Sequence, residues 1–152
     1  MAAEPALLDA INRDLLAAVQ AEGRLSLAAL GRRVGLSPSA VGERLGRLEQ
    51  AGVITGYHAA IDPRALGFTV AAIVRVRPVI RQLHRIADVA EEIAEVTECY
   101  RITGEDCFLI RLQLRSMDEL EGILDRFAPF GQTTTSIVHS APVPPRPLPL
   151  DG

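Results

Sequence analysis

The chain has 152 residues, of which 48% are hydrophobic and 23% charged, so it can build one ordinary domain or two small ones and is not a disordered polymer. Its formal net charge of −3 at pH 7 argues against a general nucleic-acid binder, so any DNA contact must lie in a local patch. The longest strongly apolar run, FTVAAIV, is too short to span a membrane, and the first residues, MAAEPALLDAINRD, carry no leading basic cluster, so we expect a cytoplasmic protein without a signal peptide.

Residues 1–56 carry the pattern of three helices. Apolar residues at helical spacing predict the first of them. Ser26 and Gly35 are the expected ends of a short second helix. Ser37 is expected to cap the third helix, with Pro38 at its first helical position. The side chains expected to face inward are those of Leu7, Leu8, Ile11, Leu15, Leu16, Val19, Leu27, Leu30, Val34, Val41, Leu45 and Leu48.

The second and third helices together predict a helix-turn-helix, whose second helix places its N-terminal half against base edges in the major groove. Gly31 is small where the two helices touch, and Gly35 is free to take the positive φ of the turn. From residue 26 to residue 47, four arginines and one glutamate give a local charge of +3, which suits contacts with phosphates. The candidate DNA-binding residues are Ser37, Ser39, Ala40, Glu43, Arg44 and Arg47.

A plain three-helix bundle with a solvated charged side is the alternative, and helical periodicity alone does not decide between the two. Gly42 and Gly46 lie inside the third helix, where each costs about 1 kcal/mol relative to alanine. We hypothesise that packing of Val41, Leu45 and Leu48 holds this helix and that it becomes firmer on DNA.

Residues 57–67 are expected to form a linker that contains the turn DPRALG. Beyond it, FTVAAIVRVR and TTTSIVHSAPV predict strands, LHRIADVAEEIAEV and MDELEGILDRF predict helices, and ECYRITGEDCFLIRLQL predicts a hairpin that turns near Gly104. This order predicts an α+β protein with a ferredoxin-like βαββαβ domain at residues 68–143, in which two helices cover one face of a four-stranded sheet. Ile73 on the other face indicates that another subunit covers it.

Residues 144–152 form a proline-rich tail, which cannot make a regular core element. We expect an extended strap along the surface; a ligand for a peptide-binding domain is the alternative. The two cysteines, Cys99 and Cys107, make neither a metal set nor a disulfide framework, and we expect them to be reduced and mostly buried.

The run LSLAALGRRVGLSPSAVGERLGRLEQAGVITGYHAAIDPRALG resembles the Lrp/AsnC (feast/famine) transcriptional regulators, because VGLSPSAV, RLEQAGVI and DPRALG fall at that family's spacing. The second half has the family's order of strands and helices. The resemblance implies a winged-type helix-turn-helix domain joined to a ligand-sensing and oligomerisation (RAM) domain. It also implies a double-stranded DNA operator, a homodimer that assembles further to a tetramer of dimers, and an amino-acid effector. Gly31 stands where the family usually has alanine.

The segment RITGEDCFLI is similar to the family's TGxxD loop, which lines an amino-acid pocket between dimers. The resemblance implies that Gly104 lets the backbone approach the ligand and that Glu105 and Asp106 face its ammonium group, Asp106 standing one position before the commoner acid. Thr133 and Thr135 would form the other wall. The alternative is that Glu105 and Asp106 only keep a turn soluble and that the threonines are only good strand formers.

The sequence therefore predicts a sequence-specific transcriptional regulator that oligomerises and binds an amino acid, with no catalytic, metal or cofactor site. One alternative is a tetrapyrrole (sirohaem-type) decarboxylase, which resembles the same two-domain family and needs convergent histidine and arginine. The histidines available are His58, His84 and His139, the last of them expected to approach Arg101 or Arg111. A further alternative is a metabolite-binding module that has lost DNA binding through Gly42 and Gly46.

Overall fold

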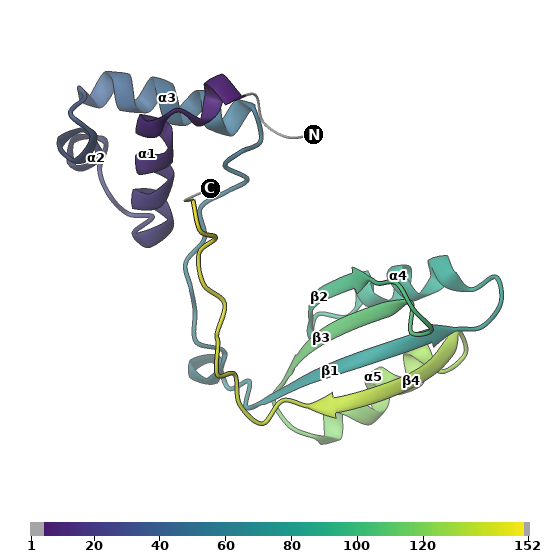
Figure 1. Cartoon of the computed structure of the whole chain (residues 1–152). Helices are drawn as coiled ribbons and strands as arrows, with labels where there is room; N and C mark the ends of the chain where they lie inside the picture. Colours follow the sequence, from purple (N-terminus) through teal and green to yellow (C-terminus); the bar gives the residue numbers. More distant parts are fainter. Residues whose placement is uncertain (1–4, 151–152) are drawn as a thin grey trace. The chain divides into compact units, whose positions relative to one another are not determined.

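The computed structural model describes residues 5–150 (Figure 1). The chain divides into two compact units, which we call the reader unit and the sheet unit. The reader unit comprises residues 1–60 together with 143–152, and the sheet unit spans Ile61–Pro142. Among the described residues, no helix has the length and apolarity that crossing a membrane requires.

Each α-helix of the reader unit begins at a side chain that caps it. Asp9, Ser26 and Ser37 accept hydrogen bonds from the backbone amide three residues further on, over 2.7, 3.1 and 3.2 Å, and so satisfy donors that the first turn leaves open. Gly35 closes the second helix with a φ of +71°. The elements are η1 (Pro5–Leu8), α1 (Ala10–Ala21), α2 (Leu27–Val34) and α3 (Pro38–Gln50). The expected caps and the expected turn glycine are confirmed.

The core of the reader unit forms where the three helices meet, and it confirms the expected anchors of α3. Val41 and Leu48 are 0% exposed and Leu45 is 7% exposed. The other buried apolar side chains are Leu15, Leu16, Ala18 and Leu30.

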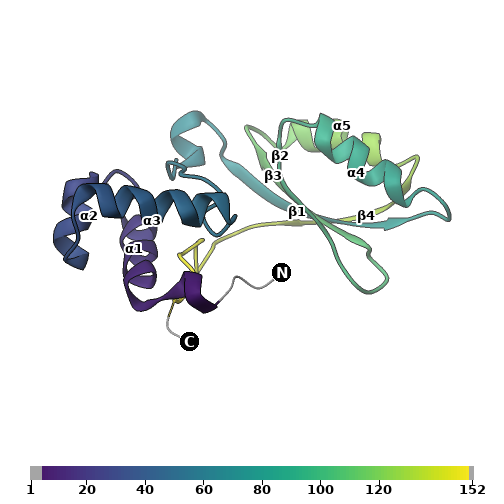
Figure 2. The same cartoon turned by 90° about the horizontal axis from the view of Figure 1, so that it is seen from above.

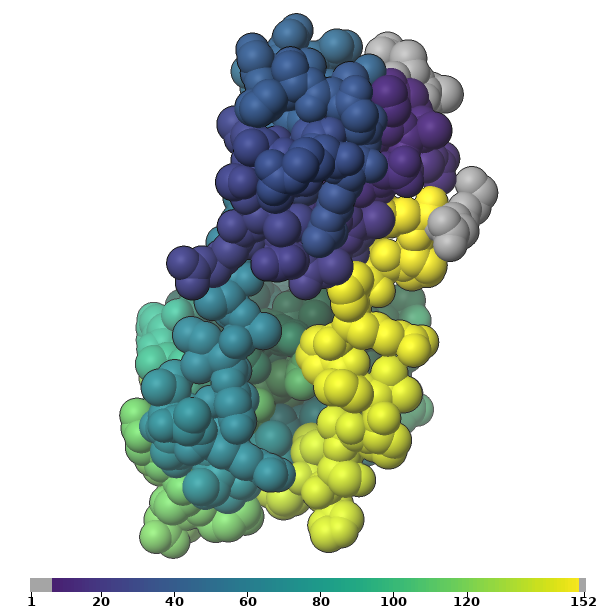
Figure 3. Space-filling model, turned by 90° about the vertical axis from the view of Figure 1, so that its left-hand side faces the viewer, coloured from purple at the N-terminus to yellow at the C-terminus, as the bar shows by residue number. Residues whose placement is uncertain are grey.

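The proline-rich tail forms no helix or strand between residues 143 and 150, and it returns to the reader unit. Leu150 packs against the helical core, and the Arg13 guanidinium donates a hydrogen bond to the Leu150 carbonyl oxygen over 2.7 Å. In Figure 3 the tail, in yellow, meets the purple residues at the start of the chain's described part. The expected strap is therefore fixed at its far end by a side chain and a backbone carbonyl.

The residues directly after α3 form no strand. Gly52 takes a φ of +70°, and the amides of Val53 and Ile54 both donate to the Leu48 carbonyl, over 2.9 and 3.2 Å. These bonds turn the chain back over the end of α3 instead of extending it. The turn DPRALG forms as expected, as the 3₁₀ helix η2 (Pro63–Leu66).

The sheet unit has the predicted ferredoxin-like order. Its strands lie in the order β2-β3-β1-β4, and every neighbouring pair is antiparallel. Figure 2 shows α4 and α5 on the same face of the sheet. The elements are β1 (Val70–Pro78), α4 (Leu83–Glu92), β2 (Val96–Arg101), β3 (Phe108–Leu114), α5 (Asp118–Phe127) and β4 (Gly131–Ile137).

Alternation along the strands separates a core face from an open face. The central strands β1 and β3 and the inner sides of α4 and α5 supply the core. On the open face, Ile73 lies opposite Arg111 of β3 and Ser136 of β4, so one half-buried apolar side chain sits among polar neighbours. The buried residues of the core are Ala72, Val74, Val76, Ile86, Val89, Ala90, Ile93, Phe108, Ile110, Leu112, Leu114, Leu120, Ile123 and Phe127.

The two cysteines are both free thiols, but the expectation that they are mostly buried is wrong for Cys99, which is exposed. It lies on β2, which is an edge strand of the sheet and is only partly covered by α4. Cys107 is half-buried, just before β3.

Candidate functional site

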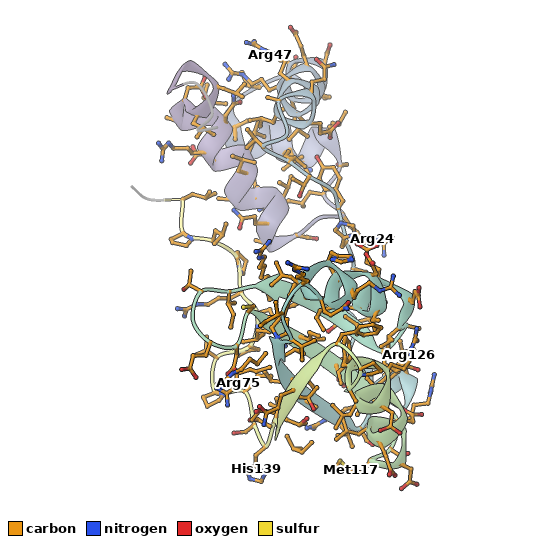
Figure 4. The ribbon with its side chains drawn as sticks, turned by 90° about the vertical axis from the view of Figure 1, so that its right-hand side faces the viewer. Arg24, Arg47, Arg75, Met117, Arg126 and His139 are labelled. Carbon is orange, nitrogen blue, oxygen red and sulfur yellow. The ribbon has the colours of Figure 1, made fainter. Side chains whose placement is uncertain are left out.

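The solvent side of α3 presents one polar stripe. Ser39, Glu43 and Arg47 are exposed and spaced four residues apart, so their side chains lie above one another on the same side of the helix. Figure 4 shows the Arg47 side chain projecting away from the reader unit. Within the described residues Arg47 makes no hydrogen bond or ion pair, so its guanidinium is available to a phosphate or a base edge.

Arg44, one of the candidate DNA-binding residues, is bonded to side chains of its own unit. Its guanidinium is 2.8 Å from the Asp9 carboxylate and 3.0 Å from the side-chain oxygen of Asn12, both belonging to the start of α1. The Arg44 side chain is 29% exposed and Asn12 is buried. The hydrogen bond from Arg44, and then the one from the Asn12 amide, hold the pKa of the Asp9 carboxyl below its usual value. Arg44 therefore ties α3 to α1.

The remaining expected DNA contacts stand at the beginning of α3. Ser37 is exposed, and its hydroxyl oxygen accepts the Ala40 amide while its hydrogen remains free to donate. Ala40 is half-buried. Two exposed arginines just before the turn, Arg32 and Arg33, were counted in the local charge but were not named as contacts; Arg33 lies 3.8 Å from Glu22.

The glycines of the helix-turn-helix differ in what surrounds them. A Cβ at Gly31 would overlap the backbone carbonyl of Leu36, so the turn requires glycine there. A Cβ at Gly42 would stand 3.4 Å from Leu27, in ordinary contact, and one at Gly46 would meet nothing within 4 Å. Gly42 and Gly46 line an apolar hollow of about 360 Å³ beside α3. Crowding therefore explains Gly31 but not the two glycines inside α3.

The loop between β2 and β3 holds its acids against arginines of β1. Asp106 lies 3.4 Å from Arg75 and 3.6 Å from Arg77, and Glu105 lies 2.5 Å from Arg77. Gly104 has a φ of +108°, which only glycine adopts easily. Both carboxylates are thus already paired with guanidinium groups of their own chain.

Thr133 and Thr135 share one face of β4, as expected, and both are half-buried. They lie opposite Val76 and Val74 of β1, on the side of the sheet that the helices cover. Arg75 lies opposite Thr134, on the open side. Within one chain, the threonines and the acidic loop therefore fall on opposite faces of the sheet and do not meet.

A second hollow, of about 350 Å³, lies between α4 and β2 and was not foreseen. We call it the α4–β2 cavity; its lining residues are Leu83, His84, Ala87, Glu91, Cys99, Arg101 and Phe108. Partial burial, and then the charge of Glu91, raise the pKa of the Cys99 thiol. The sequence signal was weak, because the lining comes from two separated segments.

The site that a tetrapyrrole decarboxylase would need does not assemble. His139 follows β4, whereas Arg101 ends β2 at the opposite edge of the sheet, and Arg111 lies on β3, which β1 separates from β4. Figure 4 shows His139 on the segment beyond β4. Residues 5–150 contain no cluster of three or more side chains suited to holding a metal ion.

The chain is similar to known regulators over most of its length. Residues 8–55 match the family described as winged helix-turn-helix DNA-binding, and residues 71–148 match the Lrp/AsnC ligand binding domain. The transcriptional regulator LrpC of Bacillus subtilis is 30% identical over 133 residues, which cover 88% of this chain and 92% of that protein. LrpA of Mycobacterium tuberculosis is 39% identical over 120 residues, which cover 78% of this chain and 80% of that protein. A Neisseria meningitidis regulator solved in complex with L-Met superimposes with a TM-score of 0.86 at 27% identity. The match covers 94% of this chain and 97% of that one.

Proposed function

The chain belongs to the Lrp/AsnC family of transcriptional regulators, and from this we propose that it reads a specific operator with α3 and responds to an amino acid bound by oligomers of its sheet unit. It is a transcriptional regulator with a helix-turn-helix DNA-binding domain and a ligand-binding domain. The curated relatives are regulators and not enzymes, which confirms the regulator over the decarboxylase alternative.

The observation that carries operator reading is the exposed stripe on a helix with a fixed start. Arg47 is suited to a guanine or a phosphate, Glu43 to the amino group of cytosine, and Ser39 to a phosphate or base edge. Ser37 would face the DNA backbone, and the methyl group of Ala40 would face a thymine methyl. Arg44 would reach a phosphate only by leaving Asp9. The exposed arginines of α2 would add phosphate contacts on the other side of the turn.

Selection from random duplex DNA tests this reading directly. A two-fold dimer should enrich a pseudo-palindrome whose half-sites stand a whole number of helical turns apart. The enriched sequence should be lost with a variant that carries Ser39→Ala, Glu43→Ala and Arg47→Ala together. A wild-type pool that stays random, with binding that disappears at moderate salt, would instead favour a module that retains only nonspecific affinity.

Dimerisation through the open face of the sheet is supported by its side chains. Ile73 and Leu109 are half-buried apolar residues there, and the Arg111–Glu98 ion pair at 3.0 Å adds both signs of charge. A two-fold axis brings such a face onto its own copy, so that unlike charges can meet and the apolar residues are covered. Native mass spectrometry should find Ile73→Glu as a monomer and Ser136→Glu, a polar position of the same face, less affected.

Because the acidic loop and the threonine pair lie on opposite faces, a further assembly of dimers offers one way for them to meet. In this arrangement Gly104, Glu105 and Asp106 of one dimer would stand against Thr133 and Thr135 of another, with the effector between them. A ligand bound at such an interface between dimers favours one assembly. By thermodynamic linkage, it therefore also changes the affinity for DNA. The relative solved with L-Met supports an amino acid as effector. Calorimetry with the twenty amino acids, and with Asp106→Ala as comparison, tests the class; we expect the regulator to work in the cytoplasm.

A further inference from the structure

The α4–β2 cavity combines two opposite charges that do not neutralise each other. Arg101 comes from the end of β2 and Glu91 from α4, and both line the cavity. Within residues 5–150, neither makes a hydrogen bond or an ion pair. This contrasts with Asp106, which has two guanidinium neighbours. Charges that line one hollow without pairing leave room for a ligand that carries both complementary charges.

Apart from His84 and the Cys99 thiol, the rest of the lining is apolar. Leu83 and Ala87 stand one helical turn apart on α4, and Phe108 begins β3. A hollow of about 350 Å³ is sufficient for a ligand of amino-acid size, since small-molecule sites begin at roughly 300 Å³. An apolar side chain of the ligand would lie on this wall.

We propose that the α4–β2 cavity binds an α-amino acid with an apolar side chain, the carboxylate on Arg101 and the ammonium group on Glu91. The fork of a guanidinium matches a carboxylate in two parallel hydrogen bonds, and a carboxylate accepts from an ammonium group. This site rests on the proposed function in that its ligand is of the effector's chemical class; it is a second site, in addition to the loop-and-threonine site. It places both charge contacts within one chain, whereas the loop-and-threonine site needs two.

The position of the cavity links it to the loop that carries Gly104. Arg101 and Phe108 are opposite one another at the base of that loop, and the Ile102 amide donates to the Cys107 carbonyl over 2.8 Å just above them. A ligand that draws Arg101 toward itself therefore acts on the residue from which the loop departs. Occupation of the cavity would thus reach the surface on which further assembly is proposed.

Calorimetry of the full chain tests the ligand class with L-leucine, L-methionine and L-aspartate. The two apolar amino acids should bind, while 4-methylpentanoate, 3-methylbutylamine and L-aspartate should bind at least tenfold more weakly. Arg101→Gln and Glu91→Gln should each weaken leucine binding at least tenfold. Arg126→Gln, on α5 outside the cavity, should stay within twofold. Wild-type affinity in both cavity variants, or no binding of any amino acid by the wild type, would overturn the proposal.

Alkylation of the two thiols locates the ligand without a substitution. Cys99 lines the cavity and is exposed, whereas Cys107 lies outside the lining, near the loop carbonyls. Saturating L-leucine should slow iodoacetamide labelling of Cys99 severalfold and leave Cys107 unchanged in mass spectrometry of the peptides. Protection of Cys107 with Cys99 unaffected would leave the loop site alone and overturn the cavity site.

Two measurements distinguish a failure of the cavity site from a failure of the proposed regulatory function. Binding of the ligand-free protein to duplex DNA is measured by gel shift, independently of any amino acid. A chain that protects Cys99 with leucine but binds no duplex retains the cavity site and loses the regulatory function. A chain that binds its operator but shows no protection of Cys99 retains the function and loses the cavity site.

Discussion

The Arg44 guanidinium reaches across from the middle of α3 to the Asp9 carboxylate, 2.8 Å away, which at the same time caps α1 through the Asn12 amide at 2.7 Å. One carboxylate thus serves two helices. The α3 helix is held by this polar contact on one flank and by the buried Val41 and Leu48 beneath it. This packing offsets the helix stability that Gly42 and Gly46 cost α3.

Breaking this contact should lower the stability of the reader unit. Arg44→Ala removes the ion pair and a hydrogen bond to the buried Asn12, and a partly exposed pair of this kind contributes about 0.2–1 kcal/mol. Asp9→Asn keeps a good cap but loses the charge. A double-mutant cycle by urea unfolding should show the two changes to be non-additive. Strict additivity would mean that the contact contributes nothing in solution.

Lowering the pH should remove the contribution of the Arg44–Asp9 ion pair to the stability of the reader unit. Because hydrogen bonding lowers the pKa of folded Asp9 below its ordinary value of 3.8, the pair stabilises the fold above that pH. The contribution is lost as pH falls through the folded pKa. Melting temperatures of the wild type and Asp9→Asn should therefore differ at pH 7 and converge toward pH 3. A difference that grows on acidification would contradict this sign.

Alanine substitutions should separate the glycines that are required from those that are not. Gly46→Ala should stabilise the reader unit by about 1 kcal/mol, because its Cβ meets nothing and helix propensity improves. Gly31→Ala should destabilise it, because its Cβ overlaps the Leu36 carbonyl. Thermal melts compare the two directly. A stabilised Gly31→Ala would mean that the turn yields without cost.

Amide exchange tests whether α3 becomes firmer on DNA. In the free protein the amides of α3 should exchange faster than those of α1, and operator DNA should reduce the difference. Gly46→Ala should reduce this difference in exchange between α3 and α1 even without DNA. Equal protection of the two helices in the free protein would remove the hypothesis that α3 is the looser element.

The tail should stabilise the reader unit through one residue. Leu150 packs on the helical core, whereas Leu148 is 78% exposed, so the two leucines form a matched pair. Leu150→Ala should lower the melting temperature and raise amide exchange at the start of α1, and Leu148→Ala should leave both unchanged. Equal behaviour of the two variants would mean that the tail is not docked in solution.

Local chemistry explains which features could be predicted from the sequence. Ser26 and Ser37 bond to amides three residues away, and Gly35 acts within its own turn, so the helix ends follow from short stretches. Strand alternation gave the two faces of the sheet for the same reason. These patterns carry the fold class and the exposed stripe of α3.

Features that depend on distant partners were missed. Arg44 borders the buried stripe of α3, and only Asp9, 35 residues earlier, decides which way it turns. The docking of Leu150 joins residues 137 positions apart. The charges of the α4–β2 cavity come from a helix and a strand whose contact exists only in the folded sheet unit.

Binding of the selected operator by Arg47→Ala, measured by fluorescence anisotropy at physiological salt beside the wild type and Arg126→Ala, tests operator reading most directly. Arg47→Ala should weaken the Kd by about 5- to 150-fold, corresponding to about 1–3 kcal/mol, and Arg126→Ala should stay within twofold. An Arg47→Ala protein that binds the operator as tightly as the wild type, with the same preference over unrelated duplex, would contradict the role of α3 as the reading helix.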